Sequence, residues 1–277
     1  ACLRRSPGWV AFRRLQREGW CRAFRRWRCW SGILRAPGVA TDPVQPGAPV
    51  EIHLLCYRLD YLTAMWALQS FYHYADVRYP LVIHLQGLVP GSALRRLQRH
   101  FPAARIIPQA EADAYVEPWL TQRGHHRLLA ARRGNPFMLK LVDFVLMGQA
   151  VHLLTLDSDV LFFRRPLELL GATRQPLSSH LFQRDPVSTY NISEERARDG
   201  LGIDLAPQVN SGIMLFQRER MDLARCEAYL AHPDVARMTG WIEQTLYAMH
   251  ASEQGCVAYL PDTYRISLAS DEPLEGL

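Results

Sequence analysis

The sequence predicts an α/β domain with a mostly parallel sheet that is covered by helices on both faces. Short apolar runs alternate with segments of helical periodicity, which is the pattern of such folds. The runs VEIHLLCY at 50–57 and VHLLTL at 151–156 are nearly continuous, as is typical of parallel strands buried on both faces. A chain of 277 residues, of which 48% are hydrophobic and 21% charged, is long enough for one such domain.

The predicted elements follow one another in the order β-α-β-α-β-α-β. Residues 50–57 form the first strand, and apolar side chains recur on one face of a helix over 59–75. The helix that precedes the last strand begins at Pro136 and ends at Gly148, two residues that favour these ends. The remaining elements are a strand at 81–85, a helix at 91–100, a strand at 105–107 and a strand at 151–156.

Residues 1–35 form a separate basic segment. They contain ten arginines and one glutamate and so carry +9, whereas the whole chain carries +5, which leaves −4 for the rest. Aromatic residues recur among the arginines at roughly helical spacing, which predicts a basic amphipathic helix. Residues 36–49 contain four prolines and two glycines and are expected to be a linker. The predicted domain then occupies 50–277.

The basic segment favours attachment to an anionic membrane surface, because aromatic rings and guanidinium groups suit the headgroup layer. Packing of the aromatics on the domain, or an irregular tail, are the alternatives. The acidic remainder of the chain argues against nucleic acid as a partner. The six cysteines have no zinc-site spacing and no apolar run reaches 18 residues, so we expect a cytoplasmic protein, peripheral on the inner face of a membrane.

A pair of acidic residues follows the last predicted strand. Asp157 and Asp159 lie two positions apart, so in extended backbone both side chains point to the same side. Ligands of α/β sheets bind beyond the carboxyl ends of the strands. Two neighbouring carboxylates repel each other unless a cation or a proton intervenes. We therefore predict a site for Mn²⁺ or Mg²⁺, which take few protein carboxylates and complete their shell with water and phosphate oxygens.

Three blocks of the sequence resemble glycosyltransferases with the GT-A fold, and most closely glycosyltransferase family 8, which contains glycogenin and bacterial lipopolysaccharide sugar transferases. The first runs from Asn135 to Leu170 and includes the acidic pair, the second is VNSGIMLF at 209–216, and the third is WIEQTL at 241–246. The blocks stand in the family's order. The resemblance implies a GT-A fold and transfer of a hexose from a nucleoside diphosphate, with UDP as the first candidate.

The resemblance also implies roles for individual residues. Asp157 and Asp159 are expected to bind the metal, and Glu243 and Gln244 to act at the donor sugar near its reactive carbon. The donor site is expected to comprise Tyr57, Lys140, Asp157, Ser158, Asp159, Asn210, Ser211 and Gly212. Retention of configuration at the sugar is expected, with a glycan or lipid-linked molecule as acceptor.

Two departures from the family's pattern stand out. Glu243 replaces the usual aspartate, and no histidine follows His250, although the family supplies its third metal ligand from a late histidine. We expect the sequence to be truncated at its C-terminal end; another ligand or a loss of metal use are the alternatives. A non-catalytic membrane-surface or carbohydrate-binding protein with this fold remains a second hypothesis. A haloacid dehalogenase-like phosphatase, which also places two aspartates after a strand, is a third.

Overall fold

The computed structural model describes residues 24, 25, 27–175 and 177–267, and the chain forms two compact units, 1–38 and 39–277. In the first unit the described residues up to Arg35 are helical. Phe24 and Trp27 stack with 5.8 Å between ring centroids and are both more than half exposed. Predictions for residues 1–23 lie outside the described residues. Membrane attachment through this segment stays a prediction, which sedimentation with anionic lipid vesicles would test.

The proline-rich stretch 36–49 is irregular, and the boundary between the two units falls inside it. From Val39 onward it belongs to the second unit. The amide of Val39 donates to the carbonyl of His100 (2.7 Å), and that of Gly47 donates to the carbonyl of Gln149 (3.0 Å). Much of the predicted linker is therefore fixed by hydrogen bonds to the body. The predicted domain limits themselves stay a prediction.

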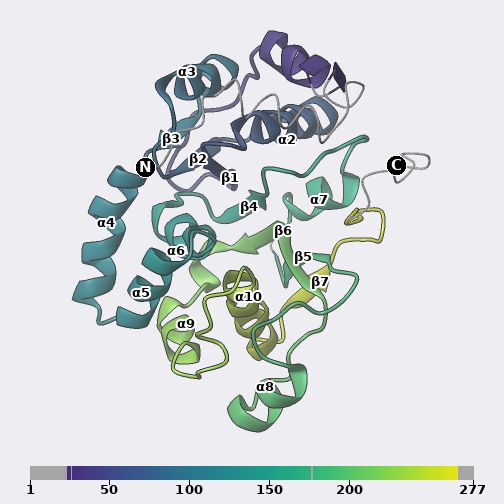
Figure 1. Ribbon diagram of the computed structural model, residues 1–277. Helices are drawn as coiled ribbons and strands as arrows, with labels where there is room; N and C mark the ends of the chain where they lie inside the picture. The colour runs from purple at the N-terminus through teal and green to yellow at the C-terminus, as the bar shows by residue number, and fades with distance from the viewer. Residues whose placement is uncertain (1–23, 26, 176, 268–277) are drawn as a thin grey trace. The chain divides into compact units, whose positions relative to one another are not determined.

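One seven-stranded sheet forms the centre of the second unit, with the order β3-β2-β1-β4-β6-β5-β7 (Figure 1). Its strands are β1 (Val50–Tyr57), β2 (Leu81–Gln86), β3 (Arg105–Ile107), β4 (His152–Leu156), β5 (His180–Arg184), β6 (Val209–Gln217) and β7 (Val257–Tyr259). Strands β3, β2, β1 and β4 pair in parallel, as do β5 and β7, whereas β6 is antiparallel to both of its neighbours. The predicted mostly parallel α/β sheet is confirmed.

The register places the predicted site at the carboxyl ends of the parallel strands. Leu54 of β1 lies beside Leu156 of β4, so the carboxyl ends of both strands lie at the same end of the sheet. Leu156 also pairs with Ile213 of the antiparallel β6. The residues that follow β4 therefore lie where the parallel part of the sheet meets its antiparallel part.

Helices cover both faces of this sheet (Figure 1). Helices α2 (Tyr61–Ala75) and α3 (Gly91–His100) lie together on one face. The other helices are α4 (Gln109–Gln122), α5 (His126–Gly134), α6 (Met138–Met147), α7 (Leu167–Ala172), α8 (Glu194–Leu201), α9 (Leu223–Tyr229) and α10 (Ile242–Glu253). The helices predicted at 59–75, 91–100 and 136–148 all form within a few residues of the predicted limits.

Helices α4 and α5 were not predicted from the sequence. In α4 only Ala112, Val116 and Leu120 are buried, one residue for each turn, and Pro118 stands inside the helix. Such a narrow apolar stripe gives a weak periodic signal, and proline argues against a helix interior. Packing of α4 on α5 and α6 stabilises it in the folded chain.

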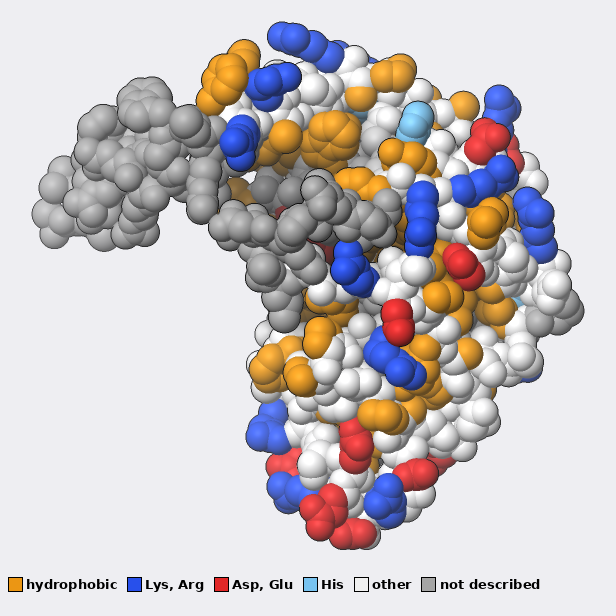
Figure 2. All heavy atoms as spheres, turned by 90° about the vertical axis from the view of Figure 1, so that its right-hand side faces the viewer, with side chains coloured by type: hydrophobic (Ala, Val, Ile, Leu, Met, Phe, Trp, Pro, Cys, Tyr) orange, Lys and Arg blue, Asp and Glu red, His pale blue; other side chains and the backbone are white. Residues whose placement is uncertain are grey.

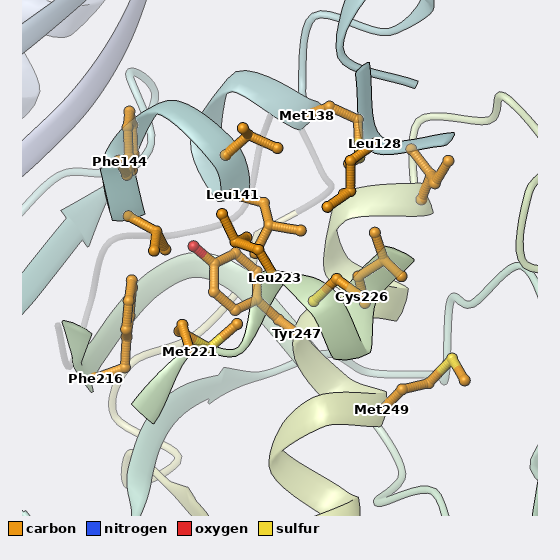
Figure 3. Close-up of a cluster of buried hydrophobic side chains, with 14 of the residues drawn as sticks. Leu128, Met138, Leu141, Phe144, Phe216, Met221, Leu223, Cys226, Tyr247 and Met249 are labelled. Carbon is orange, nitrogen blue, oxygen red and sulfur yellow. The ribbon is translucent and has the colours of Figure 1, made fainter. Parts of the chain in front are cut away.

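In the hydrophobic core on the other face, helix α6 packs against β1 and against helix α10, which itself packs on β6 (Figure 3). Figure 3 shows the Tyr247 ring among side chains of α6 and α9. The Tyr247 hydroxyl donates to the carbonyl of Lys140 (3.1 Å). Asp143 accepts two hydrogen bonds from the Arg132 guanidinium, at 2.6 and 2.8 Å. These contacts hold α6 in place, and with it the lysine that belongs to the site.

Candidate active site

The acidic pair lies at the carboxyl end of β4 and lines a pocket. The amide of Asp157 donates to the carbonyl of Gly212 (2.8 Å), which fixes its backbone against β6. The side chains of Asp157 and Asp159 both line a pocket of about 470 Å³ together with Asn210 and Gly212. This volume lies within the range of small-molecule sites. Ser158, between the two aspartates, donates to a carboxylate oxygen of Asp60 instead (3.0 Å).

Lys140 is at the centre of a buried polar cluster that adjoins the acidic pair. Its ammonium lies 2.7 Å from an Asp157 oxygen and 3.7 Å from a Glu243 oxygen. It also donates to the carbonyl and the hydroxyl of Ser211, both at 3.2 Å. Burial alone lowers the pKa of Lys140, but the carboxylates of Asp157 and Glu243 outweigh that effect and raise this pKa above its usual value. Lys140 therefore stays charged and holds one oxygen of Asp157.

Glu243 and Gln244 join this cluster from the first turn of α10. The Ser211 hydroxyl donates to Glu243 (2.9 Å), and the Ser211 amide donates to the Gln244 side-chain carbonyl (3.1 Å). Both side chains are buried. Hydrogen bonds and ion pairs through Lys140 and Ser211 thus connect the three sequence blocks, which lie on α6 and the loop after β4, on β6 and on α10.

Glycine at position 212 is required by the close packing of this site. A Cβ atom there would lie 2.8 Å from the Asn210 side-chain oxygen and 3.1 Å from that of Gln183. The Gly212 amide also donates to the Asn210 side chain (2.7 Å). A larger residue would displace these pocket-lining side chains.

The sequence analysis missed Asp185, which directly follows β5. Its carboxylate accepts hydrogen bonds from Asn210 (2.9 Å), Gln244 (3.1 Å) and Thr189 (2.7 Å). It thereby orients two of the predicted site residues. An acidic residue at a strand end is the signal that would have found it, but the strand HLFQR is too short and too polar to be recognised.

The pocket wall at 263–267 was also missed, because these residues form no regular element. Gln183 of β5 donates to the carbonyls of Tyr264 (3.1 Å) and Arg265 (3.4 Å). The Tyr264 hydroxyl donates to Glu168 (3.2 Å), which also lines the pocket. Two side chains thus hold this wall in position.

The predicted site residues fall into three groups. Those that line the pocket are Asp157, Asp159, Asn210 and Gly212. Those that are buried beside it and bonded to one another are Lys140, Ser211, Glu243 and Gln244. Tyr57, at the end of β1, and Ser158 are the third group. Ser158 lies between the two aspartates, and Tyr57 ends the strand next to β4, but neither residue is part of the pocket wall.

The residues at the pocket fit a divalent metal that relies on few protein ligands. Asp157 keeps one carboxylate oxygen apart from Lys140, and Asp159 is exposed in the same pocket. Magnesium typically binds one or two protein carboxylates and takes its other ligands from water and phosphate. Within the described part of the chain, no three His, Cys, Asp or Glu side chains are arranged to hold a metal ion. The third ligand that the family resemblance implies is therefore not found among these residues.

Titration of Glu243 is expected to make stability depend on pH. Burial raises the pKa of Glu243 from its ordinary value of 4.5 to about 7. The folded chain thus binds this proton more tightly than the unfolded chain does. The resulting stabilisation is complete below pH 4.5 and is lost as the pH rises through about 7. The melting temperatures of the wild type and of Glu243→Gln, measured across this pH range, should change differently with pH. Parallel curves would contradict this prediction.

No family model and no curated protein matches this chain. Solved structures do resemble it. The structure of the bifunctional glycosyltransferase WbbM aligns with a TM-score of 0.51 and 15% identity over 80% of this chain and 40% of that chain. Mouse xyloside xylosyltransferase 1 aligns with a TM-score of 0.50 and 17% identity over 77% of this chain and 86% of that chain. The chain thus has the GT-A fold of glycosyltransferases, as its sequence predicts. None of the described helices has the length and apolar character needed to span a membrane.

Proposed function

We propose that this protein is a glycosyltransferase that moves a hexose from a nucleoside diphosphate, with UDP as the first candidate, to an acceptor hydroxyl. The observation that carries the proposal is the position of Asp157 and Asp159 in one pocket at the carboxyl end of β4. The names of the two similar structures support a transferase, and the three sequence blocks support the family 8 type. The GT-A fold argues against the haloacid dehalogenase-like alternative.

The acidic pair would hold Mn²⁺ or Mg²⁺. Such an ion, when bound, neutralises the charge that develops on the leaving diphosphate. The protein's own contribution is to orient the pair. Lys140 supplies the buried positive charge beside Asp157, and Gly212 fixes the Asp157 backbone. Preorganised charges of this kind stabilise a transition state without further rearrangement.

We propose that transfer retains the configuration of the sugar. Inversion needs a base that reaches the acceptor hydroxyl. Glu243, the carboxylate expected near the reactive carbon, is the residue to consider as this base, but it is 2% exposed, accepts from Ser211 and lies near Lys140. That placement supports a mechanism in which the leaving diphosphate helps to deprotonate the acceptor. Gln244 is held by Asp185, Thr189 and Ser211, which supports a positioning role beside the donor sugar.

A donor panel tests the proposal. Thermal unfolding is measured with UDP-glucose, UDP-galactose, UDP-N-acetylglucosamine and GDP-mannose, each with Mn²⁺ and with excess chelator. A donor at about 100 times its Kd should raise the melting temperature by about 5 °C or more, and only with the metal. Release of free nucleotide by the same mixtures distinguishes the enzyme from the binding protein. Binding without release favours the binding protein, and the absence of any shift contradicts the proposed function.

A further inference from the structure

The pocket extends over only one half of the sheet. Its wall comes from the segment after β4, from β5 and β6, and from residues 263–267, which follow β7. Tyr57, which the family resemblance implies for the donor site, lies at the end of β1, on the other side of β4. A donor that extends from β1 to the acidic pair therefore leaves the β5–β6 half of the pocket for its sugar and for the acceptor.

The segment after the acidic pair presents apolar side chains to this half of the pocket. Phe162 anchors the segment: its amide donates to the Ser70 hydroxyl (3.1 Å), and its ring packs edge-on against Phe71 at 5.2 Å. With Phe162 buried, its neighbours Leu161 and Phe163 remain 48% and 41% exposed, and both line the pocket. Exposed apolar side chains in a pocket favour a ligand that has an apolar part.

Three arginines line the same region: Arg164, Arg165 and Arg265. Within the described part of the chain, none of the three forms an ion pair with a carboxylate. Two of the three acids that line the pocket have other partners, since Asp157 is bound by Lys140 and Glu168 accepts from Tyr264. Figure 2 shows basic and hydrophobic side chains next to one another on the side of the molecule that lies to the right in Figure 1. Guanidinium groups that pair with no carboxylate of the described residues favour a phosphate, which they bind through paired hydrogen bonds.

We propose that residues 161–165 and 264–266 form an acceptor subsite for a molecule that carries a phosphate next to an apolar chain. The arginines bind the phosphate, and Leu161 and Phe163 contact the chain. An acceptor held there lies beside Asp157 and Asp159, because all these residues line one pocket. The assignment of this ligand as the acceptor rests on the proposed function. The binding chemistry itself does not depend on transfer and is measured directly.

Calorimetric titration with three probes tests the subsite. Octyl phosphate carries both groups, octyl glucoside has the chain without the charge, and inorganic phosphate has the charge without the chain. We expect octyl phosphate to bind at least about tenfold more tightly than either of the others. The double variant Arg164→Gln/Arg265→Gln should lose about tenfold or more in affinity for octyl phosphate. Phe163→Ser should weaken octyl phosphate but not inorganic phosphate.

The matched control is Arg95→Gln, which changes an exposed arginine on α3, outside the pocket. It should bind octyl phosphate like the wild type. Equal affinity for all three probes, or equal loss in the control, overturns the subsite. The subsite is also overturned if UDP with Mn²⁺ displaces octyl phosphate and the double variant loses as much affinity for UDP as for octyl phosphate. The arginines then belong to the donor site. If octyl phosphate binds as expected but no nucleotide does, only the proposed function fails.

Discussion

Asp159→Asn is expected to lower kcat/KM for sugar transfer by about 100-fold or more, while the protein stays as stable as the wild type. Asp159 is exposed in the pocket, so the substitution removes a proposed metal ligand without leaving a buried group unpaired. A bound cation contributes several kcal/mol of charge stabilisation to a transition state, and its weaker binding loses much of that. Surface substitutions usually change stability by less than about 0.5 kcal/mol.

Two measurements check this expectation. Transfer rates are followed over a range of Mn²⁺ concentrations, and the melting temperature is recorded with UDP and Mn²⁺ together. The variant should need more metal and should lose the metal-dependent shift. Asp204→Asn is the matched control, because the Asp204 side chain is 85% exposed and its ion pair among the described residues is with Arg198 at the surface. Wild-type activity and metal response in Asp159→Asn would show that Asp159 does not bind the metal.

The elements that the sequence predicted are those whose signal is local. Strands β1 and β4 are nearly continuous apolar runs, and α6 begins after Pro136 with nine of its ten residues buried. Each pattern reflects burial on every side and is visible within a few residues. The acidic pair was recognisable for the same reason, since it directly follows β4. Local patterns thus located the carboxyl ends of the strands, where the pocket lies.

The rest of the site depends on contacts between distant segments. Lys140 and Ser211 are 71 positions apart, and they meet because β6 inserts antiparallel beside β4. The sequence predicted a mostly parallel sheet but did not indicate where an antiparallel strand inserts. Gln183 binds the carbonyls of Tyr264 and Arg265, backbone groups that carry no mark in the sequence. Tyr57 was assigned from family resemblance, but it is not part of the pocket wall.

Lys140→Met is expected to destabilise the fold by about 3–5 kcal/mol. The wild-type ammonium compensates two carboxylates, those of Asp157 at 2.7 Å and Glu243 at 3.7 Å. Methionine fills a similar volume but leaves both acids without a counter-charge, and removal of one partner of a buried ion pair is costly. The melting temperature should fall by about 10 °C or more. The fall should be smaller at acidic pH, where protonation of the carboxylates removes their repulsion.

A second substitution separates lost charge compensation from lost packing. In Lys140→Met/Glu243→Gln one of the two uncompensated charges is gone, while the glutamine side-chain carbonyl still accepts from the Ser211 hydroxyl. We therefore expect the double variant to be more stable than Lys140→Met alone. In the double-mutant cycle its loss of unfolding free energy should be smaller than the sum of the losses of the two single variants. If the two destabilisations simply add, at every pH, the lysine acts by packing alone. The buried cluster would then be structural, and the electrostatic support for Asp157 would have to come from the bound metal.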